Sequence, residues 1–352
     1  MEMRGLTAKE RYTLCGLIYY PDTTDREIAE KLKLPISTVT AIRRRLRERN
    51  FFRFAYLPML NMLGHELLVI SYGTFDPNAG EKPRELFFAK LKEINPKIFA
   101  QCRNHENWLM MSNATNYTEA KKNLDALEEY IEKHGISSSH KISHILFPYA
   151  VTLLIHFFDF RNVAKFLLPQ ETEHPFPQEE EERAQNYARE VLTRKELQVL
   201  SGLVNYPELP LSDVASKVMV SRQCVSKTEK ELRARRILKP IVIPNLHLLD
   251  YKYLVALHLQ YKTHVEKSGR DRIAATILDN FPVVFFASGT FESFIVMPVK
   301  TFDDCVAARK NLLELHASHD LLRSNPVFMF FPTEKMGCLQ DVDFRKCIGV
   351  KP

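Results

Sequence analysis

A tandem repeat limits the possible folds of this chain more than any other feature of its sequence. The segment LTAKERYTLCGLIYYP at Leu6–Pro21 returns as LTRKELQVLSGLVNYP at Leu192–Pro207, an offset of 186 residues. About twenty of the sixty-four positions from Leu6 to Val69 are identical in the second copy. The 352 residues suffice for several domains with their own cores. We therefore expect every domain of the first half to occur again in the second.

Each half begins with a predicted winged helix-turn-helix. In the first half, two short helical patterns within residues 6–34 have threonine N-caps, Thr7 and Thr24. A third follows at Pro35–Arg53, and FFRFAYL then has the composition of a strand, which predicts a wing at 51–56. Residues 64–149 show the order βαββαβ, which is typical of a ferredoxin-like sandwich with four antiparallel strands and two helices on one face.

The predicted fold class is therefore α+β, with two winged helix-turn-helix domains alternating with two βαββαβ ferredoxin-like domains. The junction between the halves contains prolines among glutamates, which indicates an acidic linker. The predicted domains are a first winged helix at 1–60, a first sandwich at 61–160, the linker at 161–191, a second winged helix at 192–246 and a second sandwich at 247–352.

The third helix of the first half has the pattern of a DNA-reading helix. Between Arg43 and Arg53 it carries six arginines against one acid, Glu48, a net charge of +5. Short hydroxyl side chains let a helix come close to DNA, and arginines read guanine edges or neutralise phosphates. A basic face that is only solvated, or that binds another acidic partner, is the alternative interpretation. We predict contacts with double-stranded DNA through Ser37, Thr38, Thr40, Arg43, Arg44, Arg45, Arg47 and Arg53.

The equivalent helix of the second half, at 221–236, is also basic but is interrupted by Glu229 and Glu231. Its residues differ from those of the first helix, so we expect the two helices to read an asymmetric operator. Its predicted DNA contacts are Arg222, Gln223, Ser226, Lys227 and Lys230.

Composition indicates a cytoplasmic protein that does not enter a membrane. The net charge of +6 is modest for this length, so charge must act through local clusters. The six cysteines show no CxxC and no zinc-type spacing, which favours a reducing compartment. The start, MEMRGLTAKER, has no apolar core of a signal peptide. The most apolar run, 142–160, is interrupted by His144, Pro148 and His156, so it predicts buried strands.

The order of the domains and two segments resemble the Lrp/AsnC (feast/famine) family of transcription regulators. The segments are RFAYLPMLNMLGHELLVISYGTF after the first winged helix and FFASGTFESFIVMPV at Phe285–Val299. The resemblance implies RAM-like sandwich domains that dimerise and sense a small molecule, an amino acid or another metabolite. Through the resemblance of the second segment to the family's central hairpin, Gly289, Thr290 and Glu292 are predicted effector contacts, whereas Arg103 replaces the glycine in the first half. Since one chain joins two units, we expect a homodimer or a self-contained pseudo-dimer.

The sequence offers little for catalysis. It has no GxGxxG, P-loop or HExxH pattern, and its 11 glycines are few for a phosphate cradle. The pairs His140/His144 and His316/His319 are more typical of surface or core histidines than of metal ligands. We therefore predict that the protein is not an enzyme and has no cofactor and no metal.

Two alternative functions remain open. Siroheme decarboxylases resemble the same family fold, with ligand-binding histidines in the sandwich domain. By that resemblance, His105, His144 or His156 would serve a tetrapyrrole. The other alternative is a module that binds protein or RNA through its winged helices.

Overall fold

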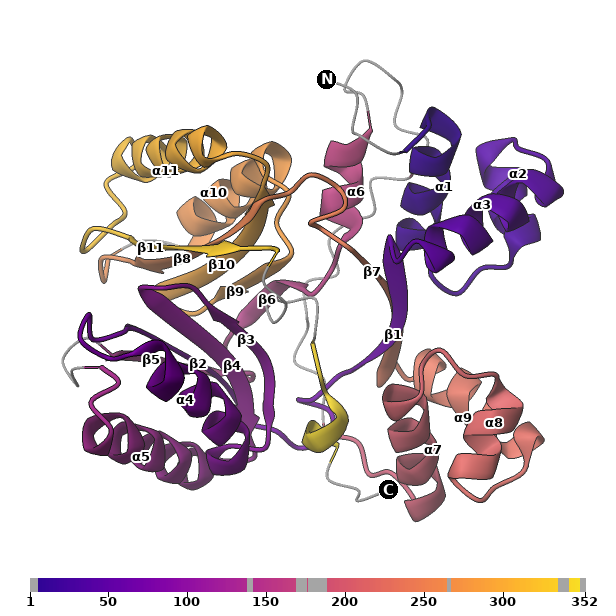
Figure 1. The fold of residues 1–352 in the computed structure, drawn as a ribbon, viewed down its shortest axis with the longest axis horizontal. Helices are drawn as coiled ribbons and strands as arrows, with labels where there is room; N and C mark the ends of the chain where they lie inside the picture. The colour runs from indigo at the N-terminus through magenta and orange to yellow at the C-terminus, as the bar shows by residue number, and fades with distance from the viewer. Residues whose placement is uncertain are drawn as a thin grey trace. The chain divides into compact units, whose positions relative to one another are not determined.

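The computed structural model describes residues 6–137, 142–168, 176, 189–264, 267–334 and 342–348 (Figure 1). The first winged domain consists of α1 (Ala8–Tyr19), α2 (Asp25–Leu32), α3 (Ile36–Glu48) and the strand β1 (Phe52–Pro58). The second half repeats this order with α7 (Arg194–Asn205), α8 (Leu211–Lys217), α9 (Arg222–Ala234) and β7 (Leu238–Pro244).

Capping residues explain where several of these helices begin. Thr7, Thr24 and Thr193 each accept a hydrogen bond from the backbone of a residue three positions later, and the acidic side chain of that residue bonds back to the cap. This reciprocal arrangement satisfies two backbone donors that a helix otherwise leaves without partners. The same box opens α1 and α7, so the repeat in sequence is also a repeat in local structure.

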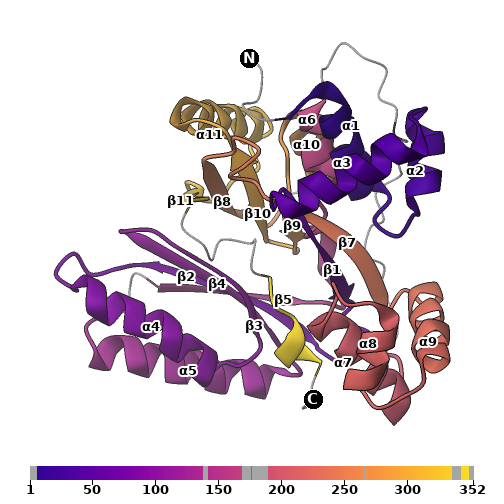
Figure 2. The ribbon, with the colours of Figure 1, turned by 45° about the vertical axis from the view of Figure 1, so that its right-hand side comes forward.

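The sandwich of the first half has four antiparallel strands in the order β3-β4-β2-β5. Figure 2 shows its two helices on one face of this sheet. Beneath them, Phe87, Trp108 and Leu127 belong to one buried cluster. The elements are β2 (Leu67–Thr74), α4 (Glu81–Ile94), β3 (Ile98–Arg103), β4 (Asn107–Ala114), α5 (Tyr117–Lys133) and β5 (Ile142–Pro148).

The sandwich of the second half has the same order plus one strand, β11-β8-β10-β9-β6. The added strand β6 (Leu153–Phe157) comes from the first half and pairs with β9. Leu257, Phe286 and Ile295 share a buried cluster with the helices. The other elements are β8 (Tyr253–Gln260), α10 (Lys267–Asn280), β9 (Phe285–Ser288), β10 (Glu292–Val299), α11 (Phe302–Ala317) and β11 (Val327–Pro332).

The chain forms two compact units, each of which draws on both halves of the sequence. Unit 1 contains Met1–Phe54, Thr152–Gln185 and Pro240–Lys335, and unit 2 contains Ala55–Val151, Asn186–Lys239 and Met336–Pro352. Each unit therefore combines the winged domain of one half with the sandwich of the other.

A segment that follows each sandwich takes part in the unit of the other sandwich. We call residues 153–167 the first arm; its helix α6 (Arg161–Leu167) packs on α1 in unit 1. We call residues 342–348 the second arm; its short 3-10 helix η2 (Arg345–Cys347) contacts α7 and β3 in unit 2. The predicted linker thus begins with α6, while its residues 169–175 and 177–188 lie outside the described residues.

The predicted α+β fold with two winged helices and two ferredoxin-like sandwiches is confirmed. In the part of the chain that the structure describes, the helices lack the length and apolar character needed to span a membrane.

Candidate functional site

The helix α3 turns polar side chains away from its buried stripe. Val39, Ile42 and Leu46 are buried beneath it. Of the predicted DNA contacts, Ser37, Thr40, Arg44, Arg45 and Arg47 are exposed, Thr38 and Arg43 are half-buried on the same helix, and Arg53 is half-buried on β1.

Asp25, the first residue of α2, binds two of these side chains. Its Oδ2 accepts a hydrogen bond of 2.8 Å from Thr40 Oγ1, and its Oδ1 lies 2.7 Å from Arg43 Nη1. Burial acts to raise the pKa of Asp25, but the hydrogen bonds from Arg43 and Thr40 outweigh it and the pKa is lowered. The ionised carboxylate therefore ties α3 to α2.

Glu10 of α1 binds a third side chain, that of Arg45. The Glu10 side chain is only 4% exposed, and its Oε1 lies 3.0 Å from Arg45 Nη1. Its Oε2 accepts hydrogen bonds from Thr7 N–H and Thr7 Oγ1 at 2.8 and 3.0 Å. Burial acts to raise the pKa of Glu10, but the hydrogen bonds with Thr7 and the charge of Arg45 leave it lowered. Glu10 thus serves as helix cap and as counter-ion at once.

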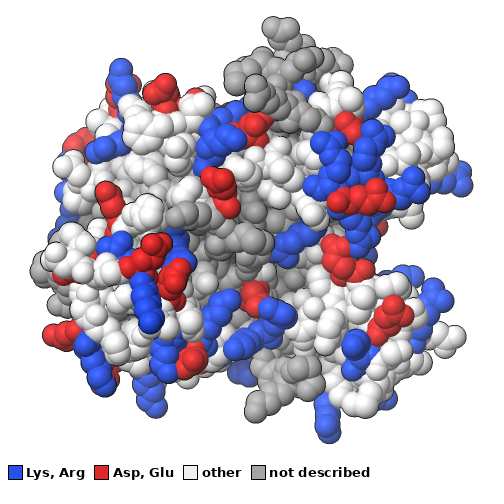
Figure 3. All heavy atoms as spheres, viewed as in Figure 1, with Lys and Arg blue, Asp and Glu red and all other residues white. Residues whose placement is uncertain are grey.

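The positive charge of α3 is therefore largely matched by nearby carboxylates. Besides the two pairs above, Arg44 Nε lies 3.9 Å from Glu48 Oε1, although both side chains are exposed and such a pair contributes little. Figure 3 shows acidic side chains among the basic ones over the region of α1 to α3. Arg43, Arg44 and Arg45 thus each face an acid within their own domain.

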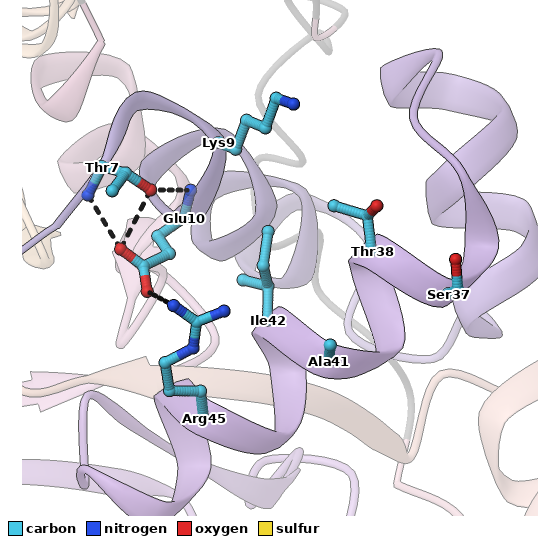
Figure 4. A pocket seen from close by; sticks show the side chains of 8 residues that line it. All are labelled: Thr7, Lys9, Glu10, Ser37, Thr38, Ala41, Ile42 and Arg45. Atoms are coloured by element: carbon cyan, nitrogen blue, oxygen red, sulfur yellow. Dashed lines mark hydrogen bonds and ion pairs between the residues drawn. The ribbon is translucent and has the colours of Figure 1, made fainter.

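A hollow of about 380 Å³ lies between the beginning of α1 and α3 (Figure 4). The Glu10–Arg45 pair closes one end, and Ser37 and Thr38 lie along α3 toward the other. Hydroxyl groups and charges of both signs suit a small polar group here better than an apolar ligand. The lining residues are Thr7, Lys9, Glu10, Ser37, Thr38, Ala41, Ile42 and Arg45.

The equivalent helix α9 has a different charge pattern. Glu229 and Glu231 stand at the positions of Arg43 and Arg45 in the repeat. Glu229 accepts a hydrogen bond from the hydroxyl of Tyr56, and Glu231 lies 3.7 Å from Lys227 Nζ. Of the predicted DNA contacts on α9, Arg222, Gln223, Lys227 and Lys230 are exposed and Ser226 is half-buried.

The predicted effector residues lie together at the β9–β10 hairpin. Arg270 Nη1 donates to the carbonyl oxygens of Gly289, at 2.7 Å, and of Thr290. Glu292 Oε2 lies 3.0 Å from Nε2 of His258, a buried histidine of β8. Both the hairpin backbone and the Glu292 carboxylate thus have partners within unit 1, so their role in effector binding stays a prediction.

The three histidines proposed for a tetrapyrrole lie on three different elements of the fold. His105 is exposed in the β3–β4 turn and His156 is half-buried on β6. His144 lies between Ser71 Oγ, 2.8 Å from its Nδ1, and Glu128 Oε1, 2.9 Å from its Nε2. Burial lowers the pKa of His144, and the hydrogen bond and charge of Glu128 oppose this.

The Ser71–His144–Glu128 row has the components of a nucleophile, base and acid. Ser71 is fully buried, however, so no substrate reaches its hydroxyl group. The row is therefore a polar cluster between the sheet and α5 with its serine inside, and it does not support a hydrolase.

Sequence reasoning missed His258 and the two arms. His258 shares β8 with the core residues Leu257 and Leu259, which pack toward the helices, so alternation places His258 on the helix-free face of the sheet. Each arm carries the tripeptide Asp-Phe-Arg, at 159–161 and 343–345, an offset of 184 residues. A repeat search that allowed a two-residue deletion would have found it.

The residues that the structure describes offer no set of ligands for a metal ion. They contain no group of three or more His, Cys, Asp or Glu side chains placed to hold an ion. The cysteines in this part of the chain form no disulfide bond with one another; they are Cys15, Cys102, Cys224, Cys305 and Cys347.

No protein-family model matches the sequence, and no curated protein matches it. Among solved structures, the siroheme decarboxylase NirDL in complex with an iron-uroporphyrin III analogue matches 96% of this chain and 96% of its own, with a TM-score of 0.54 and 12% identity. A second crystal structure of NirDL matches 97% of this chain and 98% of its own, with the same TM-score and identity. A transcriptional regulator from Neisseria meningitidis, in complex with L-Met, matches 40% of this chain and 89% of its own, with a TM-score of 0.34 and 16% identity.

These comparisons correct one prediction. The chain has an Lrp-like fold, as its sequence indicated, but two structures that match 96% and 97% of it are those of an enzyme. The prediction that the protein is not an enzyme is therefore wrong.

Proposed function

We propose that the protein is an enzyme that binds a tetrapyrrole and removes carboxyl groups from it. The observation that carries this proposal is the match to siroheme decarboxylase over 96% of both chains. The match includes both winged domains and both sandwiches, whereas the L-Met-binding regulator corresponds to 40% of this chain. The duplicated architecture as a whole therefore favours the enzyme.

Decarboxylation of a side chain sets clear demands on such a site. The reaction R–COO⁻ + H⁺ → R–H + CO₂ breaks the bond to the carboxyl carbon, and the electron pair left behind must take a proton. The site therefore needs cations that hold the carboxylates of the tetrapyrrole and a group that delivers a proton.

His258 is the residue that we propose as the proton donor. Its side chain is on the helix-free face of its sheet, beside the ring of Phe294. The carboxylate of Glu292, 3.0 Å from Nε2, orients the imidazole. His144 suits the role less well, because its two nitrogens face Ser71 and Glu128 on the helix-covered side.

Titration of the purified full chain with siroheme and with an iron-uroporphyrin III analogue tests the proposal. We expect a saturable shift of the tetrapyrrole absorbance and, with siroheme, products whose mass is lower by one CO₂ per step. His258→Gln should abolish turnover and retain binding, while His144→Gln, the matched control, should retain both. Absence of binding to either tetrapyrrole by the folded protein would contradict the assignment.

We propose DNA binding by α3 as a second candidate function, which the exposed row of arginines supports. The Arg44 side chain is 78% exposed, and its pair with Glu48 is long. Exposed pairs of this kind contribute about 0–1 kcal/mol, so a phosphate group can displace the carboxylate. Binding through about four phosphates should weaken roughly a hundredfold between 50 and 200 mM salt. Fluorescence anisotropy with labelled duplex DNA measures this, and affinity that is insensitive to salt would exclude the DNA proposal.

A further inference from the structure

The two arms share one local structure. In the first arm, Asp159 accepts hydrogen bonds from the backbone N–H, Nε and Nη2 of Arg161, and in the second arm Asp343 accepts the same three from Arg345. The phenylalanine between them, Phe160 or Phe344, is buried in both cases. The Asp-Phe-Arg tripeptide therefore folds into the same clamp at both places and buries its aromatic ring.

The second arm is held in unit 2 by contacts at both its ends. Asp343 N–H donates a hydrogen bond of 2.8 Å to the carbonyl of Phe99, and the rings of Phe344 and Phe99 stack with centroids 5.0 Å apart. Farther along, the thiol of Cys347 lies 3.5 Å from the carbonyl oxygen of Lys97. The carbonyl oxygen of Cys347 lies 2.8 Å from Nε2 of His65.

His65 must therefore be neutral, with its proton on Nε2, when the arm is docked. A carbonyl oxygen only accepts hydrogen bonds, so Nε2 is the donor. The side chain is 5% exposed, and its Nδ1 has no hydrogen-bond partner among the described residues. A second proton on Nδ1 would place an unpaired charge in a buried position, which is costly.

The position of unit 1 that is equivalent to His65 carries no imidazole. Tyr251 stands there, and the first arm is anchored instead by the thiol of Cys15, which lies 3.6 Å from the carbonyl oxygen of Ala164. The two arms thus share a clamp and differ in the residue that meets their far end.

We propose that the second arm is an acid-released latch: it stays docked on unit 2 at neutral pH and undocks when His65 takes up a second proton.

The other titratable groups around His65 are consistent with release of the arm in acid. Burial lowers the pKa of His65, the hydrogen bond to the Cys347 carbonyl opposes this, and the nearby charges of Lys97 and Glu119 act in opposite senses. The pKa values of Glu119 and Asp343 are lowered and those of Cys347 and Tyr149 are raised, so these four groups keep their charge states in mild acid. His65 is therefore the group of this cluster that titrates there.

The direction of the pH dependence of docking follows from the difference between the docked and undocked pKa of His65. The undocked imidazole has an ordinary pKa of about 6.5, and the docked one has a lower pKa. Docking is then fully favoured above about pH 6.5 and weakens as the pH falls, by up to about tenfold per pH unit, until the docked pKa is reached.

Hydrogen exchange of the full chain, corrected for the intrinsic pH dependence of amide exchange, tests the proposal. The protection of residues 342–348 should stay constant from pH 7.5 to about 6.5 and then fall toward pH 5 at a rate approaching tenfold per unit. His65→Gln keeps a donor for the Cys347 carbonyl but does not titrate, so its protection should be independent of pH. His144→Gln removes a half-buried histidine of the same sandwich and should behave like the wild type.

Two results would overturn the latch. One is a wild-type arm whose protection does not change with pH, and the other is an equal loss of protection in His65→Gln. If His65→Gln does not fold, wild-type chain labelled with ¹³C in histidine and phenylalanine replaces it. The His65 imidazole and the Phe344 ring must then titrate together in NMR spectra, and independent titration would equally reject the proposal.

Discussion

Val218 lies so close to Gly202 that a β-carbon at position 202 would stand 2.5 Å from the Cγ1 atom of Val218. This is the contact between α7 and the end of α8. At the equivalent position of the first half, Gly16, a β-carbon would meet Cδ1 of Leu32 at 3.3 Å. The same glycine is thus required sterically in one half and nearly dispensable in the other.

Gly202→Ala should accordingly lower the free energy of unfolding by about 1–3 kcal/mol, because the added methyl group forces Val218 to move. Gly16→Ala is the matched control. Leu32 needs to move by only a few tenths of an ångström. Alanine also stabilises a helix by about 1 kcal/mol relative to glycine. Urea unfolding followed by circular dichroism compares the two, and equal destabilisation would contradict the packing described.

Gly73→Ala should disturb the sandwich of the first half. A β-carbon there would lie 2.9 Å from two ring atoms of Trp108, which is fully buried and the only tryptophan of the chain. We expect a loss of about 1–3 kcal/mol from overpacking. Tryptophan fluorescence reports on this position directly, so the emission of the folded variant should also shift. An unchanged spectrum together with unchanged stability would show that the strand accommodates a side chain.

Asp25→Asn should weaken the attachment of α3 to α2. The change removes the charge that Arg43 meets at 2.7 Å, and we expect a loss of about 1 kcal/mol because both side chains are partly exposed. The effect should depend on pH. Because the pKa of Asp25 is lowered on folding, its contribution is present above its ordinary pKa of 3.8 and is lost as the pH falls through the folded value.

Denaturant midpoints measured at neutral pH and near pH 3 check this prediction. The wild type and Asp25→Asn should differ at neutral pH and converge in acid. A difference that persists at the lower pH would mean that Asp25 acts through hydrogen bonding to Thr40 and not through its charge.

Arg44→Ala should separate the two candidate functions. If α3 reads DNA, the variant should bind a specific site more weakly by about 1–3 kcal/mol and leave tetrapyrrole binding unchanged. Arg53→Ala, on β1, should weaken binding to all DNA sequences alike. Anisotropy with specific and random duplexes distinguishes these outcomes, and equal losses for both variants on both DNAs would refute the assigned roles.

The sequence predicted the parts of the fold that depend on local periodicity. The caps at Thr7 and Thr24 were readable because each is encoded within a few residues. The repeat then supplied the second half.

The partners of the site residues were not readable in the same way. The bond between Arg43 and Asp25 depends on how α3 crosses α2, and the pair of His258 and Glu292 depends on the register between β8 and β10. Neither the sequence pattern nor the number of charges predicts how these helices cross or how these strands are aligned. The basic helix was therefore located correctly, but the acids that neutralise much of it were not foreseen.

The second arm also has a consequence for how the protein is made. Cys347 meets the carbonyl of Lys97, 250 positions earlier in the chain, and the side chain of His65, 282 positions earlier. While a ribosome is still translating the second half, the first sandwich already exists without the residues that cover Phe99 and His65. Phe99 and His65 stay without this cover until Phe344 and Cys347 have been synthesised. Until then they are accessible to chaperones and to neighbouring nascent chains.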